Sequence, residues 1–91
     1  PELLDAIVHK PFYPTDSTPH IYLEMPFSGH VDIQLFNIMG QHLGTVYNEI
    51  MLEGSIEINV RERLSTYLAS GKYIYRIQVQ DKKLSKSIMV A

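Results

Sequence analysis

The sequence contains no cysteine, no tryptophan and no long apolar run among its 91 residues. Without cysteine the chain can form no disulfide framework, no thiolate zinc site and no cysteine nucleophile. No stretch approaches the roughly 18 apolar residues of a membrane-spanning helix, and no signal-peptide pattern is visible. The formal net charge is −2. The sequence therefore lacks the excess of positive charge expected of a protein that binds nucleic acid or an anionic membrane. We therefore expect no nucleic-acid partner and no membrane insertion.

The composition is that of a small globular domain, with 45% hydrophobic and 20% charged residues. A chain of this length has room for one hydrophobic core. It begins at Pro1, and its first methionine is Met25. We expect residues 1–91 to be a single domain excised from a longer product.

Apolar and polar residues alternate along four segments, which is the pattern of half-buried β-strands. In the first segment Ile21, Leu23 and Met25 alternate with Tyr22 and Glu24. The four segments are Ile21–Met25, Val31–Phe36, Ser55–Val60 and Tyr73–Val79. Three weaker strands are predicted at Leu4–His9, Leu43–Tyr47 and Leu84–Val90. Turn residues separate the strands at Pro26–Gly29, around Gly40 and Gly44, and at Asp81–Lys83.

Two connecting segments have other patterns. In Arg61–Ser70, Leu64 and Leu68 have helical spacing, and Gly71 is placed like the residue that ends a helix. About ten residues is marginal for a stable helix, so the segment is predicted to be a crossover with one helical turn and leucines that cap the core. Lys10–Pro19 contains three prolines and is predicted to be an extended, rigid loop.

Short antiparallel strands with solvated outer faces favour two sheets packed face to face. We therefore predict an all-β fold, an immunoglobulin-like antiparallel β-sandwich of about seven strands. The cysteine and tryptophan marks of antibody domains are absent, so composition alone does not separate this sandwich from other sandwiches or a small barrel.

The histidines and serines carry no recognisable catalytic or metal motif. The histidines, at positions 9, 20, 30 and 42, share no ligand spacing and are interpreted as polar surface or turn residues. His20 and His30, both at strand ends, leave open a weak two-ligand arrangement. No nucleophile elbow and no glycine-rich phosphate loop occurs.

The carboxylates fall where water keeps them ionised. Glu24, Asp32 and Glu57 are in the outward phase of their strands, where no desolvation raises their pKa values. The others considered are predicted in turns: Glu49, Glu53, Glu62 and Asp81. We therefore predict no enzyme, no cofactor, and no catalytic, cofactor-binding or metal-binding residue.

The tyrosines and terminal lysines have two interpretations each. Tyr73 and Tyr75 share the phase of Ile77 and Val79 and are predicted to pack inside, with hydroxyls that reach the sandwich edge. An outward strip that joins Tyr22, Phe36 and Ile74 would serve binding, whereas scattered surface aromatics would not. The last group, Lys82, Lys83 and Lys86, is either a solvated face or a device that discourages strand pairing at a sheet edge.

The order of motifs resembles the C-terminal sorting domain of type IX secretion cargo. The segments that carry the resemblance are Lys10–Pro14, Ile21–Pro26, Gly29–Gln41, Leu68–Ile77 and Lys83–Val90. Within them, Leu68–Ile77 is similar to the family's Leu-x-x-Gly-x-Tyr-x-Tyr-Arg segment, and Lys83–Val90 to its basic, then apolar, terminal strand. The likeness covers about residues 8–91.

This resemblance implies a sorting address on a larger secreted protein. By the likeness, the cargo lies N-terminal to the domain and passes through the periplasm, and the type IX outer-membrane translocon recognises the domain. A surface sortase then removes the domain while attaching the cargo to lipopolysaccharide, and the cargo ends at the cell surface or in the medium. The residues that carry over as candidates for translocon recognition are Gly71, Tyr73, Tyr75, Arg76, Lys83, Lys86 and Val90. We expect the last hairpin to present an edge strand to the translocon.

Other assignments stay open at this point. The alternatives are a non-catalytic accessory module of a secreted enzyme, acting as a spacer, a protein-binding or a carbohydrate-binding unit, and a domain like that of the flagellar hook-cap protein. A carbohydrate module would need its outward aromatics, and Tyr22 is the residue to test.

Overall fold

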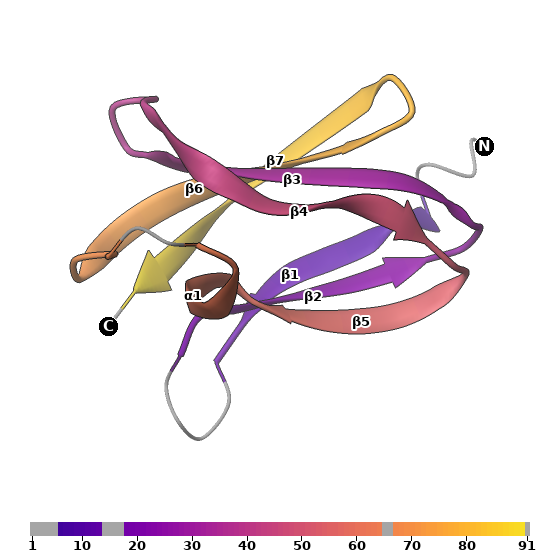
Figure 1. The fold of residues 1–91 in the computed structure, drawn as a ribbon, viewed down its shortest axis with the longest axis horizontal. Helices are drawn as coiled ribbons and strands as arrows, with labels where there is room; N and C mark the ends of the chain where they lie inside the picture. Colours follow the sequence, from indigo (N-terminus) through magenta and orange to yellow (C-terminus); the bar gives the residue numbers. More distant parts are fainter. Residues whose placement is uncertain (1–5, 14–17, 65–66, 91) are drawn as a thin grey trace.

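Two antiparallel sheets pack face to face in the computed structural model, which describes residues 6–13, 18–64 and 67–90 (Figure 1). One sheet has the order β1-β2-β5 and the other β4-β3-β6-β7. The elements are β1 (Val8–Phe12), β2 (His20–Met25), β3 (Gly29–Asn37), β4 (His42–Met51), β5 (Gly54–Asn59), α1 (Val60–Arg63), β6 (Gly71–Val79) and β7 (Lys82–Val90). The predicted seven-stranded sandwich is confirmed. In the part of the chain described, no helix is long and apolar enough to span a membrane.

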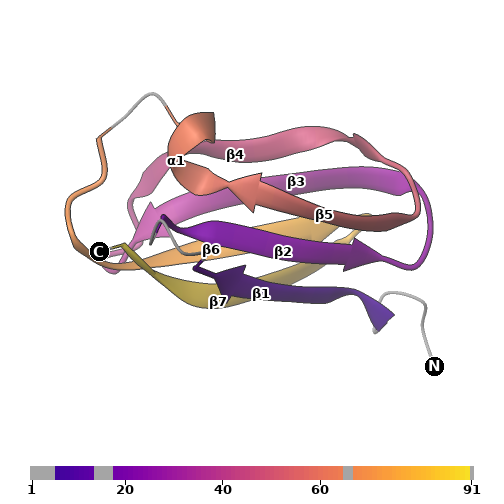
Figure 2. The same ribbon diagram turned by 90° about the horizontal axis from the view of Figure 1, so that it is seen from below.

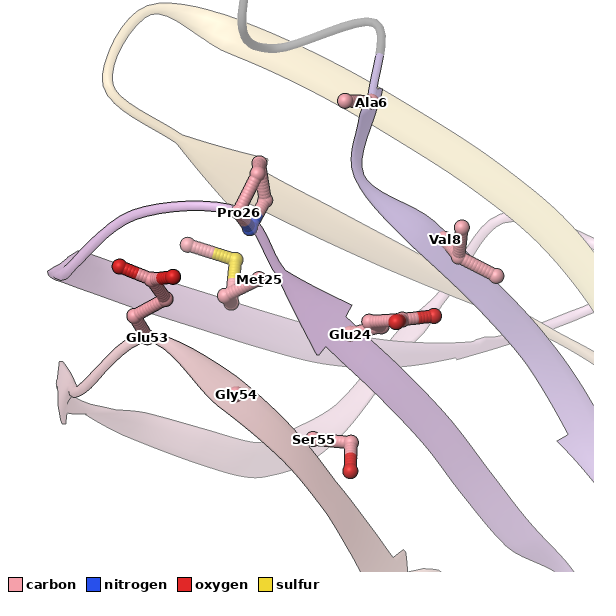
Figure 3. A pocket seen from close by; sticks show the side chains of 8 residues that line it. All are labelled: Ala6, Val8, Glu24, Met25, Pro26, Glu53, Gly54 and Ser55. Carbon is pink, nitrogen blue, oxygen red and sulfur yellow. The ribbon is translucent and has the colours of Figure 1, made fainter.

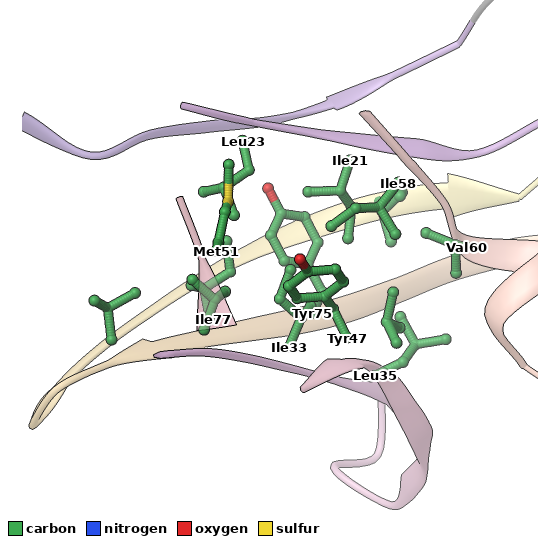
Figure 4. Packing of buried hydrophobic residues seen from close by; sticks show 14 of the residues in the cluster. Ile21, Leu23, Ile33, Leu35, Tyr47, Met51, Ile58, Val60, Tyr75 and Ile77 are labelled. Carbon is green, nitrogen blue, oxygen red and sulfur yellow. The ribbon is translucent and has the colours of Figure 1, made fainter. Parts of the chain in front are cut away.

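The core lies between the sheets and is built by residues that alternate along the strands (Figure 4). Ile21, Leu23 and Met25 of β2 point inward, as the sequence predicts, and each is at most 1% exposed. The facing sheet contributes Val31, Ile33 and Leu35 from β3 and Tyr75, Ile77 and Val79 from β6. Because the side-chain period of a strand is two, the same pattern leaves the outer faces to polar residues.

The first strand differs from its predicted position. β1 spans Val8–Phe12 rather than Leu4–His9, so it includes Pro11, which the sequence predicts in a loop. β1 is an edge strand that pairs only with β2, and an edge strand accommodates proline where its missing N–H would point away from the neighbour. Residues 4–5 of the predicted strand and residues 14–17 of the predicted loop lie outside the described residues.

Strand β4 is longer than predicted and contains Gly44 and Glu49, both assigned to turns. Its register against β3 shifts twice, which breaks the alternation that reveals a strand in sequence. Gly44 lies within the strand rather than in a turn, and a Cβ there would lie 2.8 Å from Leu64 Cδ2, so that the Leu64 side chain would have to shift. Gly40, with a φ of 85°, does form the β3–β4 turn as predicted.

The crossover between the sheets contains one helical turn, as predicted. The Asn59 side chain caps α1 by accepting a hydrogen bond of 3.3 Å from the Glu62 backbone N–H, and this places Glu62 in the helix rather than a turn. Leu64 is extended and Leu68 is buried in the core. Gly71 begins β6 and ends no helix, while residues 65–66 lie outside the described residues.

Candidate recognition surface

The terminal hairpin consists of β6 and β7, and β7 is an outer strand of the four-stranded sheet. The two strands pair from Gly71 with Val90 to Val79 with Lys82. Only Gln80 and Asp81 form the turn, with Gln80 at a φ of 58°. The predicted turn residues Lys82 and Lys83 therefore belong to β7, because the hairpin closes more tightly than the sequence indicated.

Two of the candidate residues lie inside the sandwich. Tyr75 is fully buried and Val90 is 3% exposed, so a partner cannot contact either side chain while the domain is folded. Tyr73 is half-buried, and its hydroxyl donates a hydrogen bond of 2.7 Å to the Ala69 carbonyl. Gly71, also half-buried, starts β6 beside Val90. Tyr75 and Val90 therefore belong to the core, Tyr73 packs against it, and Gly71 lies at the start of the hairpin.

Two other candidates face outward from the four-stranded sheet. Arg76 lies between the buried Tyr75 and Ile77, and its guanidinium carbon is 5.1 Å from the centre of the Phe36 ring. The buried Nε atom of Arg76 finds no hydrogen-bond partner among the described residues. Lys83 is exposed on β7 opposite Gln78. Arg76 and Lys83 thus sit on one outer surface of the hairpin.

Lys86 occupies a different position, in the inward phase of β7. It lies directly opposite the buried Tyr75, where strand alternation places an apolar residue. Its Nζ atom instead donates a hydrogen bond to the backbone carbonyl of His9 on β1. Lys86 therefore bridges the edge strands of the two sheets, which run along the same side of the molecule (Figure 2).

His9 continues this bridge into the core. Its Nδ1 atom and the Tyr75 hydroxyl share a hydrogen bond of 3.0 Å, and the rings meet edge to face. Burial, and secondarily the Lys86 ammonium group, lower the pKa of His9 below 6.5, so the imidazole is neutral at pH 7. Burial also raises the pKa of the Tyr75 hydroxyl. The interpretation of His9 as a surface histidine is wrong, because His9 shares the inward phase of Ile7 and is 8% exposed.

The backbone of β7 has one edge turned away from β6. The Met89 N–H donates a hydrogen bond of 2.7 Å to the Tyr13 hydroxyl instead of to β6. Backbone groups alternate in direction along a strand, so the N–H and C=O groups of Ser85 and Ser87 also point away from β6. Neither serine has a side-chain hydrogen bond among residues 6–13, 18–64 and 67–90, and both are exposed. Among the described residues, no strand pairs with this edge of β7.

Sequence reasoning missed the contacts of His9 and Tyr13 with the hairpin. One signal was present, because Lys86 interrupts the apolar phase that Leu84, Ile88 and Val90 define. A lysine in that phase needs an acceptor near the core. The identity of that acceptor, a backbone carbonyl 77 positions away, has no signature in the sequence.

Charge is distributed unevenly between the hairpin and the rest of the chain. Five of the eight Lys and Arg residues lie in β6 and β7, and no Asp or Glu does. Including Asp81 of the turn, residues 71–90 have a formal charge of +4, against −6 for the other residues. The net charge of −2 therefore conceals a basic hairpin on an acidic domain.

Of the two interpretations of the outward aromatics, the strip that joins Tyr22, Phe36 and Ile74 does not form. Phe36 and Ile74 are paired neighbours on the four-stranded sheet, but Tyr22 is on β2 of the other sheet, whose outer face is on the opposite side of the sandwich. The Tyr22 hydroxyl donates a hydrogen bond of 3.4 Å to Glu24, and Lys10 Nζ lies 5.6 Å from its ring centre.

A pocket of about 350 Å³ lies at one end of the three-stranded sheet (Figure 3). Glu24 and Glu53 line it together with Val8 and Ser55. Within the described ranges, no group of three or more His, Cys, Asp or Glu residues could hold a metal ion. His20 and His30 lie on strands of different sheets, so the two-ligand arrangement is not supported.

A comparison with known protein families gives a match over most of the chain. The family described as "Secretion system C-terminal sorting domain" matches residues 11–91. The matched range includes all of β2 to β7 and the last two residues of β1. A comparison with curated proteins finds no match.

Proposed function

Because the chain belongs to the family of secretion system C-terminal sorting domains, we propose that it is recognised through the exposed edge of β7. Domains of this family are C-terminal sorting signals for type IX secretion of cargo proteins. The type IX machinery recognises them, and the cargo is exported toward the cell surface or the extracellular space. The family match carries the function, and the unpaired backbone of Ser85 and Ser87 supports the place of recognition.

Recognition by this edge would use strand addition. An extended segment of the translocon pairs with the outward N–H and C=O groups of β7, and side chains beside the new strand select the partner. In this proposal Lys83 contacts the partner and Lys86 lies beside the same edge, while Arg76, whose guanidinium lies over Phe36 of β3, adds positive charge to the same outer face from β6. Tyr75 and Val90 act indirectly, since both are buried and keep β7 seated. Tyr73 and Gly71 fix the start of the hairpin.

The proposal includes the larger protein and its route. Residues 1–91 act as one domain behind an N-terminal cargo that travels through the periplasm, and a sortase acts on the domain after translocation. The domain itself supplies no catalytic step. The carboxylates of its strands support this view, since Glu24 and Glu57 are exposed and Asp32 accepts a hydrogen bond from Gln34.

Export of a fused reporter tests the proposal. The chain is fused behind an exported fluorescent reporter in cells with a type IX system, and in matched cells that lack the translocon. Deleting Lys86–Ala91 should block export, but this deletion also removes the buried Ile88 and Val90 and would unfold the domain. A sharper variant is Ser87→Pro, which removes one outward N–H and leaves the pairing with β6 intact.

Ser87→Ala is the matched control, because it removes the hydroxyl and keeps the N–H. We expect Ser87→Pro to reduce export strongly while the domain melts near the temperature of the Ser87→Ala variant. Equal export of the two variants would refute recognition by the β7 edge. Export of the intact fusion in cells without the translocon would refute the type IX assignment itself.

A further inference from the structure

The geometry points to the chemistry of the partner. We infer that the β7 edge binds an acidic, extended protein segment, with carboxylates on both faces of the strand that it adds. This inference rests on the proposed function, because it concerns the same edge. It names the partner segment that the basic hairpin can accept.

The first step of the argument is the placement of the cations. Lys72 and Arg76 of β6 and Lys83 of β7 are in the outward phase of the four-stranded sheet. Among the described residues, none of these three forms an ion pair. No acidic side chain of either strand competes for them. Carboxylates of an added strand would lie beside Lys83 at the spacing of cross-strand pairs, where opposite charges attract.

The second step concerns the inner face of the added strand. Lys86 points inward at the border of the sheet and is exposed. Its Nζ atom has donated one hydrogen bond, to the His9 carbonyl, and an ammonium group has three donors. An inward carboxylate next to Lys86 would accept a second hydrogen bond. The partner therefore needs acidic residues on both faces of its strand, one beside Lys83 and one beside Lys86.

At the Met89 end of the β7 edge, the partner strand needs an apolar side chain. Met89 is 52% exposed in the same outward row as Lys83, and Ser85 and Ser87 lie between them. The segment that fits has acidic residues toward the β6–β7 turn and an apolar side chain toward Met89. Charge and hydrophobic contact together fix the direction in which it lies.

The same charges argue against a second copy of this chain as the partner. Antiparallel pairing of two β7 strands about Lys86 places Lys86 opposite itself, pairing about Leu84 places Lys82 opposite Lys86, and pairing about Lys83 places Lys83 opposite itself. Like charges directly opposite one another are destabilising in a sheet. Edge lysines of this kind discourage self-pairing, so the edge selects an acidic strand from another protein.

Peptide binding to the 91-residue chain tests the inference. The probe is a labelled peptide of about ten residues, with glutamates on both faces and a valine at one end, and its partner peptide has glutamine at each glutamate. We expect the acidic peptide to bind about tenfold more tightly than the amide peptide, with a difference that shrinks in roughly 0.5 M salt. Equal affinity of the two peptides, measured by fluorescence anisotropy, would overturn the inference.

Three protein variants separate strand addition from general attraction. Lys83→Gln should weaken binding of the acidic peptide, whereas Lys10→Gln, which removes a lysine on the outer face of the other sheet, should not. Ser87→Pro should abolish binding although every charge remains. If Ser87→Pro binds the acidic peptide normally, the surface attracts anions without pairing, and the inference fails.

Two further measurements test whether a lipid surface or a second copy of this chain, rather than an acidic strand, binds the β7 edge. Tighter binding to phosphatidylglycerol vesicles than to the acidic peptide would identify a lipid surface and would overturn the inference. A dimer that Ser87→Pro dissociates would assign the edge to a second copy and would also overturn it. These failures are distinct from failure of the proposed function. Reporter export that depends on the β7 edge, together with peptides that do not bind, would leave the sorting role in place and remove only the acidic partner.

Discussion

The two lateral sides of the sandwich are closed in different ways. On one side, β4 connects directly to β5, so the chain itself joins the sheets, and α1 packs against both strands. Arg63 reinforces this side through an ion pair of 3.2 Å with Glu49 and a contact of 5.2 Å with the Tyr47 ring. On the other side, the hydrogen bonds found among the described residues involve side chains: Lys86 of β7 to the His9 carbonyl of β1, His9 to Tyr75 of β6, and the Met89 N–H of β7 to Tyr13, which follows β1.

The difference shows where the fold leaves a site available. The chain connection between β4 and β5 keeps that side closed at any pH and with any partner bound. The β1–β7 side is held by a few hydrogen bonds, and no strand in the described part of the chain pairs with the outward backbone groups of Ser85 and Ser87. A small domain that must present a strand edge can do so on the side that its chain does not cross.

The largest expected effect on stability comes from a substitution in the core that both sides share. Ile77→Ala removes a side chain that is fully buried and should lower the free energy of unfolding by about 2–5 kcal/mol, on a domain stable by about 5–10 kcal/mol. Ile50→Ala is the control, because Ile50 is 74% exposed. Denaturant unfolding measures both variants. If Ile77→Ala melts like the native chain, the core assignment is wrong.

Removing the hydroxyl of each buried tyrosine compares how much hydrogen bonding contributes to the free energy of unfolding on the two sides. Tyr75→Phe leaves His9 Nδ1 without its partner and should reduce the free energy of unfolding by about 1–3 kcal/mol. Tyr47→Phe, on the β4–β5 side, should have a smaller effect because no hydrogen bond of its hydroxyl is found in the described part of the chain. Urea unfolding of the two variants is the measurement. A larger loss in Tyr47→Phe would reverse the comparison.

A pH titration should reveal the contribution of His9 to the stability of the β1–β7 side. Since folding lowers the pKa of His9 below 6.5, the unfolded chain takes up a proton at a higher pH than the folded one. The contribution of His9 is therefore fully present above pH 6.5 and is lost as the pH falls through the lowered pKa. Thermal melts from pH 8 to pH 5 should show this decline. His9→Gln should flatten it, while His30→Gln, at an exposed position, should not. An identical slope in His9→Gln would contradict the burial of a neutral imidazole.

The ion pair of the β4–β5 side should have the smallest effect. Both side chains of the Arg63–Glu49 pair are about half exposed, and such pairs contribute about 0–1 kcal/mol. Glu49→Gln should therefore change the melting temperature by no more than a few degrees. A larger loss, in a melt at low salt, would mean that side chains rather than the chain connection close this side.

The sequence predicts the sheets better than the sides. Alternation identifies β2, β3 and β6 because their inner residues meet one continuous core, and the family motifs point to the terminal hairpin. Pro11 obscures β1, and the register shifts of β4 obscure its length. Contacts such as Lys86 with His9 depend on how two distant edges meet, and no local pattern records that. Arg76 and Lys83 face outward as a recognition role requires, whereas Tyr75 and Val90 are buried.

The most direct test of recognition by β7 is crosslinking during export. A photoreactive side chain is placed at Ser87 on the β7 edge, or at Ser55 on β5, which is also exposed, in the reporter fusion. We predict that Ser87 crosslinks to an outer-membrane component of the type IX system and that Ser55 does not. Crosslinks from Ser55 alone, or equally from both positions, would contradict the account.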